Sequence, residues 1–223
     1  MAAPHQQPPG ASWDVAFAAL AAACVWPLFY VHYAPIQDLP QHLAAVRLLH
    51  DFANPAYGFA RFFEVDLWRT QYLAYYLVAD LLSYVVDVEL ANKLLIAASM
   101  IATPYTLRGL LDALGKDRRL ALLAFPLAYN AHLILGFLNF LAAIPLSFYG
   151  VMLAVRQRRS PSRMRALGLA VVCLLCFYTH VVPFLLLGLG VALVALSGSL
   201  RATLRGLFRF KPAAPIFLGG SLV

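Results

Sequence analysis

Long apolar runs separated by short basic clusters dominate this sequence, and they restrict the chain to a fold that crosses a membrane several times. A helix needs about 20 mostly apolar residues to cross the roughly 30 Å hydrocarbon core of a bilayer. Of the 223 residues, 62% are apolar and 12% are charged, against about 45–50% and about 25% in soluble domains. The apolar runs cover 13–34, 71–86, 90–107, 120–135, 137–155, 164–179 and 181–196, and an eighth begins at 212.

The basic residues predict which side of the membrane each loop faces. Thirteen of the 17 Lys and Arg residues fall into three clusters, at 108–119, 156–165 and 201–211. Two apolar runs lie between successive clusters, so each pair of runs forms a hairpin that leaves and returns. Because cytoplasmic loops carry an excess of Lys and Arg, we expect all three clusters to be cytoplasmic.

The segment 35–89 has the opposite character, with seven acidic and three basic residues, and we expect it to be a large external loop. Only one crossing then fits between this loop and Arg108. We assign that crossing to 90–107 and place 71–86, which contains Asp80, in a helix at the outer interface, where a carboxylate is not stranded in hydrocarbon. The alternative makes 71–86 a full span and puts the N-terminus outside.

The expected fold is therefore all-α: a polytopic helical membrane protein with about six to seven transmembrane helices and two external juxtamembrane helices. We treat 1–223 as a single transmembrane domain, the N-terminal module of a longer protein, because the apolar run at the C-terminus stops without a polar end. We expect it in the inner (plasma) membrane of a bacterium, with its N-terminus cytoplasmic. The oligomeric state stays open.

The remaining composition excludes other classes of protein. The net charge of +7 resides in loops of the kind that cytoplasmic sides carry, so we expect no nucleic-acid partner. Cys24, Cys173 and Cys176 all lie inside apolar runs. There a thiol behaves as a small hydrophobe, and the CxxC spacing of the last two indicates packing ahead of redox chemistry.

The stretch from Ala34 to Phe52 carries the most informative polar pattern. Asp38, followed by Pro40 and Gln41, is a helix start of the capping-box type. Asp38 and His42 are four residues apart, so they project from one side of the first turn. A capping Asp needs no further role, but this pair follows the first span and would meet a lipid headgroup at the membrane surface.

Other polar side chains are predicted at the same level of the membrane. On the expected outer side we single out His132 and Asn139 near one turn and Tyr178 and His180 near the next, together with Arg47 on the helix of the Asp38 pattern. Ionisable groups at such depths usually face a cavity or a partner. Singly, each is an ordinary interface residue; their shared side makes the group a candidate site.

This arrangement resembles the integral-membrane glycosyltransferases of the GT-C class, which use polyprenyl-phosphate sugars. The resemblance is carried by a first span, an external DxPxH-like motif that opens a juxtamembrane helix, a second interfacial helix and a basic first inner loop. It implies that Asp38 is the catalytic base and that the lipid bilayer and a polyprenyl-phosphate-linked sugar are the partners. Members of the class often have a second acidic residue in the second external loop. This chain has ILGFLNF there, without a carboxylate. Either His132 or Asn139 takes the place of that acid, or the activity differs.

If the whole protein is active, the resemblance implies transfer of a sugar to an acceptor on the outer side of the membrane. We expect His42, His180 or Arg47 to help bind phosphate, with His132, Asn139 and Tyr178 as further substrate-binding candidates. No cofactor is assigned, and a divalent metal ion is left open. Tyr72, Tyr75 and Tyr76 either line a sugar or lipid groove or form an ordinary aromatic belt.

Two other functions fit the same hydropathy. A non-catalytic membrane protein, such as a transporter half or an assembly subunit, would show helices broken by Gly or Pro at the bilayer midplane. A metal carrier would use His32, His42, His132 and His180, but no HxxxH or HxxE spacing joins them within one helix. We therefore assign no metal ligands.

The predicted sidedness is testable by cysteine labelling. Single cysteines introduced at Gln37 and at Ser160, in a background without the native cysteines, should react with a membrane-impermeant thiol reagent in intact cells only at Gln37. Labelling at Ser160 would overturn the orientation.

Overall fold

The computed structural model describes residues 11–67 and 71–207, and within them the side chains of 12–67 and 71–197. This part of the chain is helical and contains no strand. Its elements are α1 (Ala11–Tyr30), α2 (Leu39–His50), η1 (Phe59–Arg61), α3 (Leu73–Ser83), α4 (Val88–Ala113), η2 (Arg118–Leu123), α5 (Ala124–Leu127), α6 (Ala131–Leu135), α7 (Leu138–Arg159), α8 (Arg163–Thr179) and α9 (Val181–Leu207).

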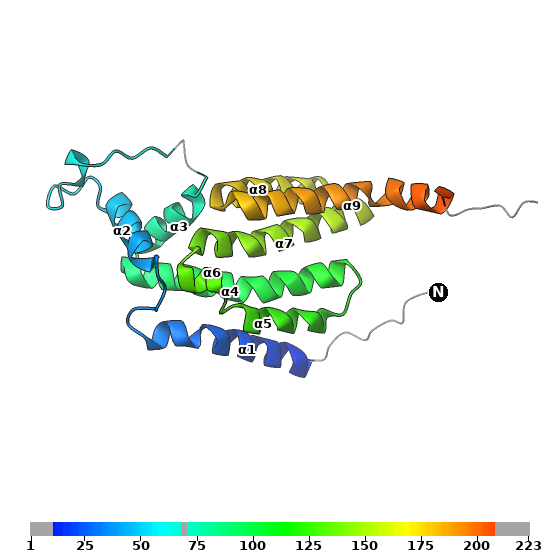
Figure 1. Ribbon diagram of the computed structural model, residues 1–223, viewed down its shortest axis with the longest axis horizontal. Helices are drawn as coiled ribbons and strands as arrows, with labels where there is room; N and C mark the ends of the chain where they lie inside the picture. Colours follow the sequence, from blue (N-terminus) through cyan, green and yellow to red (C-terminus); the bar gives the residue numbers. More distant parts are fainter. Residues whose placement is uncertain (1–10, 68–70, 208–223) are drawn as a thin grey trace, which may run out of the picture.

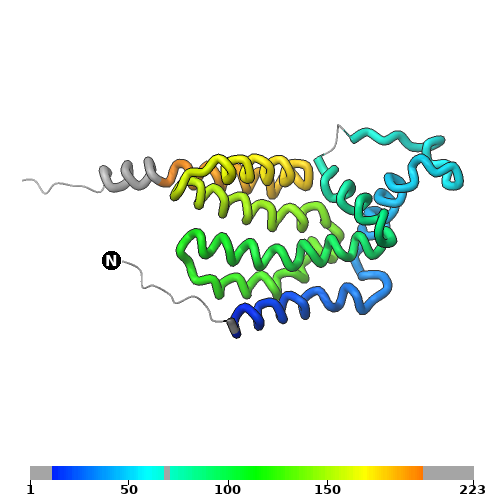
Figure 2. Tube along the Cα trace, turned by 180° about the vertical axis from the view of Figure 1, so that it is seen from behind, coloured from blue at the N-terminus to red at the C-terminus, as the bar shows by residue number. Residues whose placement is uncertain are grey.

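The long helices run side by side as a bundle, with α2, α3 and the loop between them at one end (Figure 1). The view from behind shows the same arrangement (Figure 2). Helix α7 is central, because it packs against α4, α8 and α9. The basic loops that follow α4 and α7 lie at the opposite end of the bundle from α2 and α3, so the two ends differ in charge as the sequence predicts.

Glycine allows α7 and α9 to approach closely. A Cβ on Gly150 of α7 would lie 2.5 Å from Leu187 Cδ1, and a Cβ on Gly190 of α9 would lie 2.5 Å from Val151 Cγ2. Leu187 of α9 thus packs against Gly150 of α7, and Val151 of α7 packs against Gly190 of α9. Such small-residue contacts are typical of helix packing inside membranes, where burial of apolar surface between helices gives little driving force.

Within the described residues, three helices are long and apolar enough to cross a membrane: Ser12–Tyr30, Val88–Ala113 and Leu138–Arg159. These correspond to the predicted runs 13–34, 90–107 and 137–155. Helices α8 and α9 do not meet this standard. Helix α8 has 17 residues and begins with two arginines within three residues. The apolar part of α9 that is described, Val181–Ser197, is shorter than the three candidate spans. The described residues therefore show a helical protein with three candidate spans, and the expected six to seven are not confirmed. The eighth run, from 212, lies outside the described residues.

The segment 71–86, predicted as an interfacial helix, contains helix α3, which is shorter than expected. Helix α3 has 11 residues, which at a rise of 1.5 Å per residue reach about 16 Å, too little to cross a bilayer. Asp80 lies 3.0 Å from Nδ1 of His50 on α2, so its carboxylate meets a polar partner. This geometry favours the interfacial assignment over a full span.

The run 120–135 differs from the expected continuous span, because it consists of η2, α5 and α6 in succession. Pro126 has no backbone N–H to donate to the preceding turn. Asn130 then begins a new helix, since its Oδ1 accepts a hydrogen bond from Leu133 N at 3.1 Å. Apolar composition alone does not distinguish such an interrupted segment from one continuous helix.

The link between α1 and α2 is held against the end of α6. Gln37 N donates to Ile134 O at 2.8 Å and Asp38 N donates to Leu135 O at 3.3 Å. Gly136 follows α6 with φ of 92°, and a Cβ there would lie 2.8 Å from the Asp38 Cβ. The turn between α6 and α7 thus packs backbone to backbone against the residues that begin α2.

The Gly136 contact predicts a matched pair of substitutions. Gly136→Ala should destabilise the fold by about 1–3 kcal/mol from its left-handed backbone conformation and by more from the clash with Asp38. Gly115→Ala is the control, because Gly115 also has a positive φ but nothing within 4 Å of the new Cβ. Thermal unfolding in detergent should rank Gly136→Ala clearly below Gly115→Ala; equal losses would contradict the close approach.

Candidate functional site

Asp38 lies at the start of α2, at the end of the bundle that we expect to be external. Its side chain makes no capping hydrogen bond to α2, so the predicted capping box is wrong. The backbone of Asp38 has φ of −91° and ψ of 5°, outside the extended conformation usual for a capping residue. Its backbone groups are bonded to Leu135, Gln41 and His42. The Asp38 carboxylate is half-buried and makes no hydrogen bond or ion pair with any described residue; we call it unengaged.

His42 is held at both ring nitrogens. Nε2 lies 2.8 Å from Gly136 O, and because a carbonyl only accepts, this nitrogen carries the proton. Nδ1 of the neutral ring then accepts from the Tyr76 hydroxyl at 2.9 Å. Burial lowers the pKa of His42, while the bond to Gly136 and the charge of Asp38 oppose that shift. His42 therefore joins α2, α3 and the α6–α7 turn as a neutral ring.

Asn139, near the start of α7, lies beside Tyr76. It is 8% exposed, and its buried Oδ1 has no hydrogen-bond partner in the part of the chain that the structure describes. Burial raises the pKa of Tyr76, and a hydrogen bond with the Asn139 side chain partly offsets that rise. Tyr75, beside Tyr76 on α3, donates to Asn92 Oδ1 at 3.0 Å. The predicted residues Asp38, His42 and Asn139 are thus brought together, with Tyr76 connecting the last two.

A second group of rings surrounds His180. The ring of Tyr72 meets it edge to face at 5.1 Å between centroids, and Phe140 does so at 5.3 Å. The ring of His132 in turn stacks on Phe140 at 4.9 Å. His180 Nδ1 accepts from Val182 N at 3.1 Å, which places the proton of the neutral ring on Nε2. Burial lowers the pKa of His180.

The two groups are adjacent. Tyr72 directly precedes α3 and lies four residues before Tyr76, and Asn139 and Phe140 are consecutive on α7. Each pair thus joins the Asp38–His42 group to the His132–His180 group. We name the combined set the outer cluster: Asp38, His42, Tyr72, Tyr76, His132, Asn139, Phe140 and His180.

Two predicted residues have other contacts. Arg47 forms an ion pair with Asp51 at 2.8 Å, one turn further along α2, and hydrogen bonding with that carboxylate raises its pKa. Tyr178 meets the ring of its neighbour Phe177 at 5.2 Å. These contacts place neither side chain in the outer cluster. Beyond the cluster, an interaction between His50 and Asp80 ties α2 to α3.

The cluster offers one unengaged carboxylate, one imidazole N–H at His180 and a wall of aromatic rings. A carboxylate of this kind can take a proton, and an imidazole N–H can donate to an anion. The described residues contain no group of three or more His, Cys, Asp or Glu side chains placed to hold a metal ion. The sequence analysis does not predict Gly136 or Phe140 as site residues. For Gly136 the sequence gives one indication, the glycine that begins the predicted turn GFLNF.

The neutral state of His42 predicts a dependence of stability on pH. Its pKa in the folded protein is below the ordinary value of 6.5, so the stability it contributes is present above pH 6.5 and is lost as the pH falls toward the folded pKa. Protonation removes the acceptor that Tyr76 uses. The thermal unfolding midpoint of the wild type should fall between pH 7.5 and 5, and His42→Gln should flatten that fall. An equally steep fall in His42→Gln would contradict the assignment.

Comparisons with known proteins provide no relative for this arrangement. The chain matches no protein-family model, no curated protein and no solved structure. Statements about function therefore rest on the outer cluster and on the sequence pattern.

Proposed function

We propose that the protein is a membrane glycosyltransferase-like enzyme that transfers a sugar from a polyprenyl-phosphate donor to an acceptor on the outer side of the membrane. The proposal places the outer cluster at the external surface of the bilayer, with the N-terminus and the basic loops in the cytoplasm. It follows from the GT-C resemblance of the Asp38–His42 pattern and from the predicted sidedness.

The observation that carries the proposal is the unengaged carboxylate of Asp38. A carboxylate used only for helix capping would bond to the amides of its own helix, and this one does not. Its backbone is fixed by α6 and by α2 instead, so the main chain of Asp38 is held while its carboxylate oxygens stay available to accept a proton. That combination is what a general base requires.

In the proposed reaction Asp38 accepts the proton of the acceptor hydroxyl. The acceptor oxygen bonds to the anomeric carbon while the bond from that carbon to the phosphate oxygen breaks, and the electron pair leaves with polyprenyl phosphate. Donors near the developing phosphate charge stabilise this transition state, and Nε2–H of His180 is the group suited to that task. His42, with both nitrogens engaged, is a positioning residue.

The alternative is a non-catalytic membrane protein such as a transporter half. The interrupted segment from η2 to α6 favours it, because broken helices line the substrate sites of many transporters. The ionisable side chains of the outer cluster, however, lie at the end of the bundle, whereas the broken segment carries no charged side chain or histidine between Arg119 and His132. A chemical site at the membrane surface accounts for that distribution better.

We predict that Asp38→Asn abolishes transfer while the protein remains folded and inserted. The amide keeps the shape of the side chain but cannot take a proton, so turnover should fall by about 10²-fold or more. The assay uses proteoliposomes with a synthetic polyprenyl-phosphate hexose and measures release of free polyprenyl phosphate in the presence of a cell lipid extract as acceptor.

Asp51→Asn is the matched control, because Asp51 is a carboxylate beside the same helix whose partner is Arg47. It should retain wild-type turnover. Equal activity of Asp38→Asn and wild type would exclude Asp38 as the base. Movement of the intact donor across the bilayer without cleavage, unaffected by Asp38→Asn, would establish the transporter alternative.

A further inference from the structure

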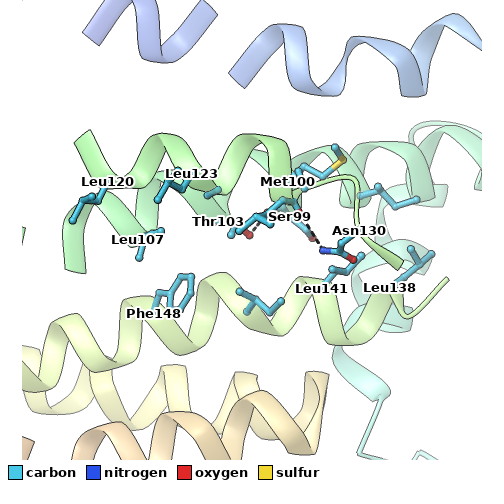
Figure 3. Close-up of a pocket in the computed structure, with 15 residues that line it drawn as sticks. Ser99, Met100, Thr103, Leu107, Leu120, Leu123, Asn130, Leu138, Leu141 and Phe148 are labelled. Atoms are coloured by element: carbon cyan, nitrogen blue, oxygen red, sulfur yellow. Dashed lines mark hydrogen bonds between the residues drawn. The ribbon is translucent and has the colours of Figure 1, made fainter. Parts of the chain in front are cut away.

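A cavity of about 290 Å³ lies between α4, α7 and the interrupted segment of η2 and α5. Leu107 and Leu120 lie toward one end of it, and Asn130 and Leu138 lie toward the other (Figure 3). Its wall is apolar except for Ser99, Thr103 and Asn130. The outer cluster does not account for this cavity, since none of its members lines the wall.

The three polar side chains in the wall are bonded to their own segments. Ser99 Oγ donates to Leu95 O and Thr103 Oγ1 donates to Ser99 O, both at 2.8 Å. The Asn130 amide donates to Leu127 O and accepts from Leu133 N. A polar ligand would find few groups ready to recognise it, so the wall favours a hydrocarbon occupant.

The cavity is open along the interrupted segment. Leu120, Leu123 and Leu127 line it and are 50%, 62% and 66% exposed. In the membrane placement proposed above, these side chains face lipid, because they lie beside α4 and α7, two of the candidate spans. Hydrocarbon chains of the bilayer therefore have direct access to the cavity.

One end of the cavity adjoins the basic end of the bundle. Leu120 directly follows Arg118 and Arg119 in the chain. Lys116 is exposed and has no acidic partner among the described residues, whereas Arg119 is 66% exposed at its side chain and pairs only with the nearby Asp117. Exposed cations beside an apolar cavity match the negative headgroup and acyl chain of an anionic lipid.

We propose that this cavity is a binding site for an anionic phospholipid of the inner leaflet, with one acyl chain between η2, α4 and α7 and the headgroup against Lys116 and Arg119. The site rests on the membrane placement but not on sugar transfer. It would stabilise the interrupted segment, because the lipid chain fills a space that no protein side chain fills.

The test measures lipid retention by native mass spectrometry. Delipidated protein in detergent is titrated with palmitoyl-oleoyl phosphatidylglycerol or with the matching phosphatidylcholine. We expect one phosphatidylglycerol molecule to bind at least tenfold more tightly than phosphatidylcholine. Ala128→Phe, which adds a ring at the cavity wall, should weaken binding at least tenfold, while Ala170→Phe, on the exposed side of α8, should leave it unchanged.

Headgroup recognition is tested with exposed residues, whose substitution does not disturb the core. Lys116→Gln with Arg119→Gln should reduce phosphatidylglycerol binding to the phosphatidylcholine level, whereas Arg159→Gln with Arg163→Gln, an equal loss of charge at the same end, should not. Wild-type retention in Ala128→Phe, or in Lys116→Gln with Arg119→Gln, would overturn the site. Displacement by polyprenyl phosphate that is indifferent to Lys116 and Arg119 would assign the cavity to that lipid instead. Because the readout needs no turnover, these outcomes are independent of the proposed transferase.

Discussion

The structure depends on satisfying backbone hydrogen-bonding groups where helices end inside or beside a membrane. The last carbonyls of α6 have no partner within that helix, and the amides of the α1–α2 link have none within α2. The amides of Gln37 and Asp38 donate to the carbonyls of Ile134 and Leu135. Each set of unpaired groups thus satisfies the other, which spares both the cost of an unpaired backbone group.

The same constraint explains the end of α1. Its last turn is followed by Val31 and His32, whose carbonyls accept from Lys93 Nζ on α4, and Glu89 lies 3.2 Å from that ammonium. A lysine in an apolar run therefore acts as a hydrogen-bond donor to a helix end, and its charge is partly neutralised by the neighbouring acid. Both ends of the α1–α2 link are fixed to other elements, so the position of Asp38 relative to α6 and α7 is set by backbone contacts.

The sequence predicts the helical class and the positions of α1, α4 and α7, because few arrangements besides membrane-spanning helices accommodate long apolar runs between basic clusters. It also predicts an interfacial helix at 71–86 from the cost of placing Asp80 in hydrocarbon. It does not predict the break in 120–135: the effect of Pro126 depends on whether neighbouring groups satisfy the carbonyl it leaves unpaired, and Pro104 and Pro145 lie inside helices that continue. Likewise, spacing brings Asp38 near His42, but the rings of α3 and α7 reach the cluster only through tertiary packing.

The position of the Asp38 carboxylate along the bundle distinguishes a chemical role from a transport role better than the fact that the residue is an aspartate. A transported solute must be held near the middle of the bilayer and released to both sides, whereas a lipid-linked substrate presents its reactive group at the surface, where the phosphate is hydrated. Asp38 lies in the link between a candidate span and the short helix α2, at one end of the bundle. It is one turn from His42, whose ring packs against Tyr75 and Tyr76 of α3. Backbone bonds hold the main chain of Asp38 and leave its carboxylate without an ion pair among the described residues, and the proposed acid–base role depends on this.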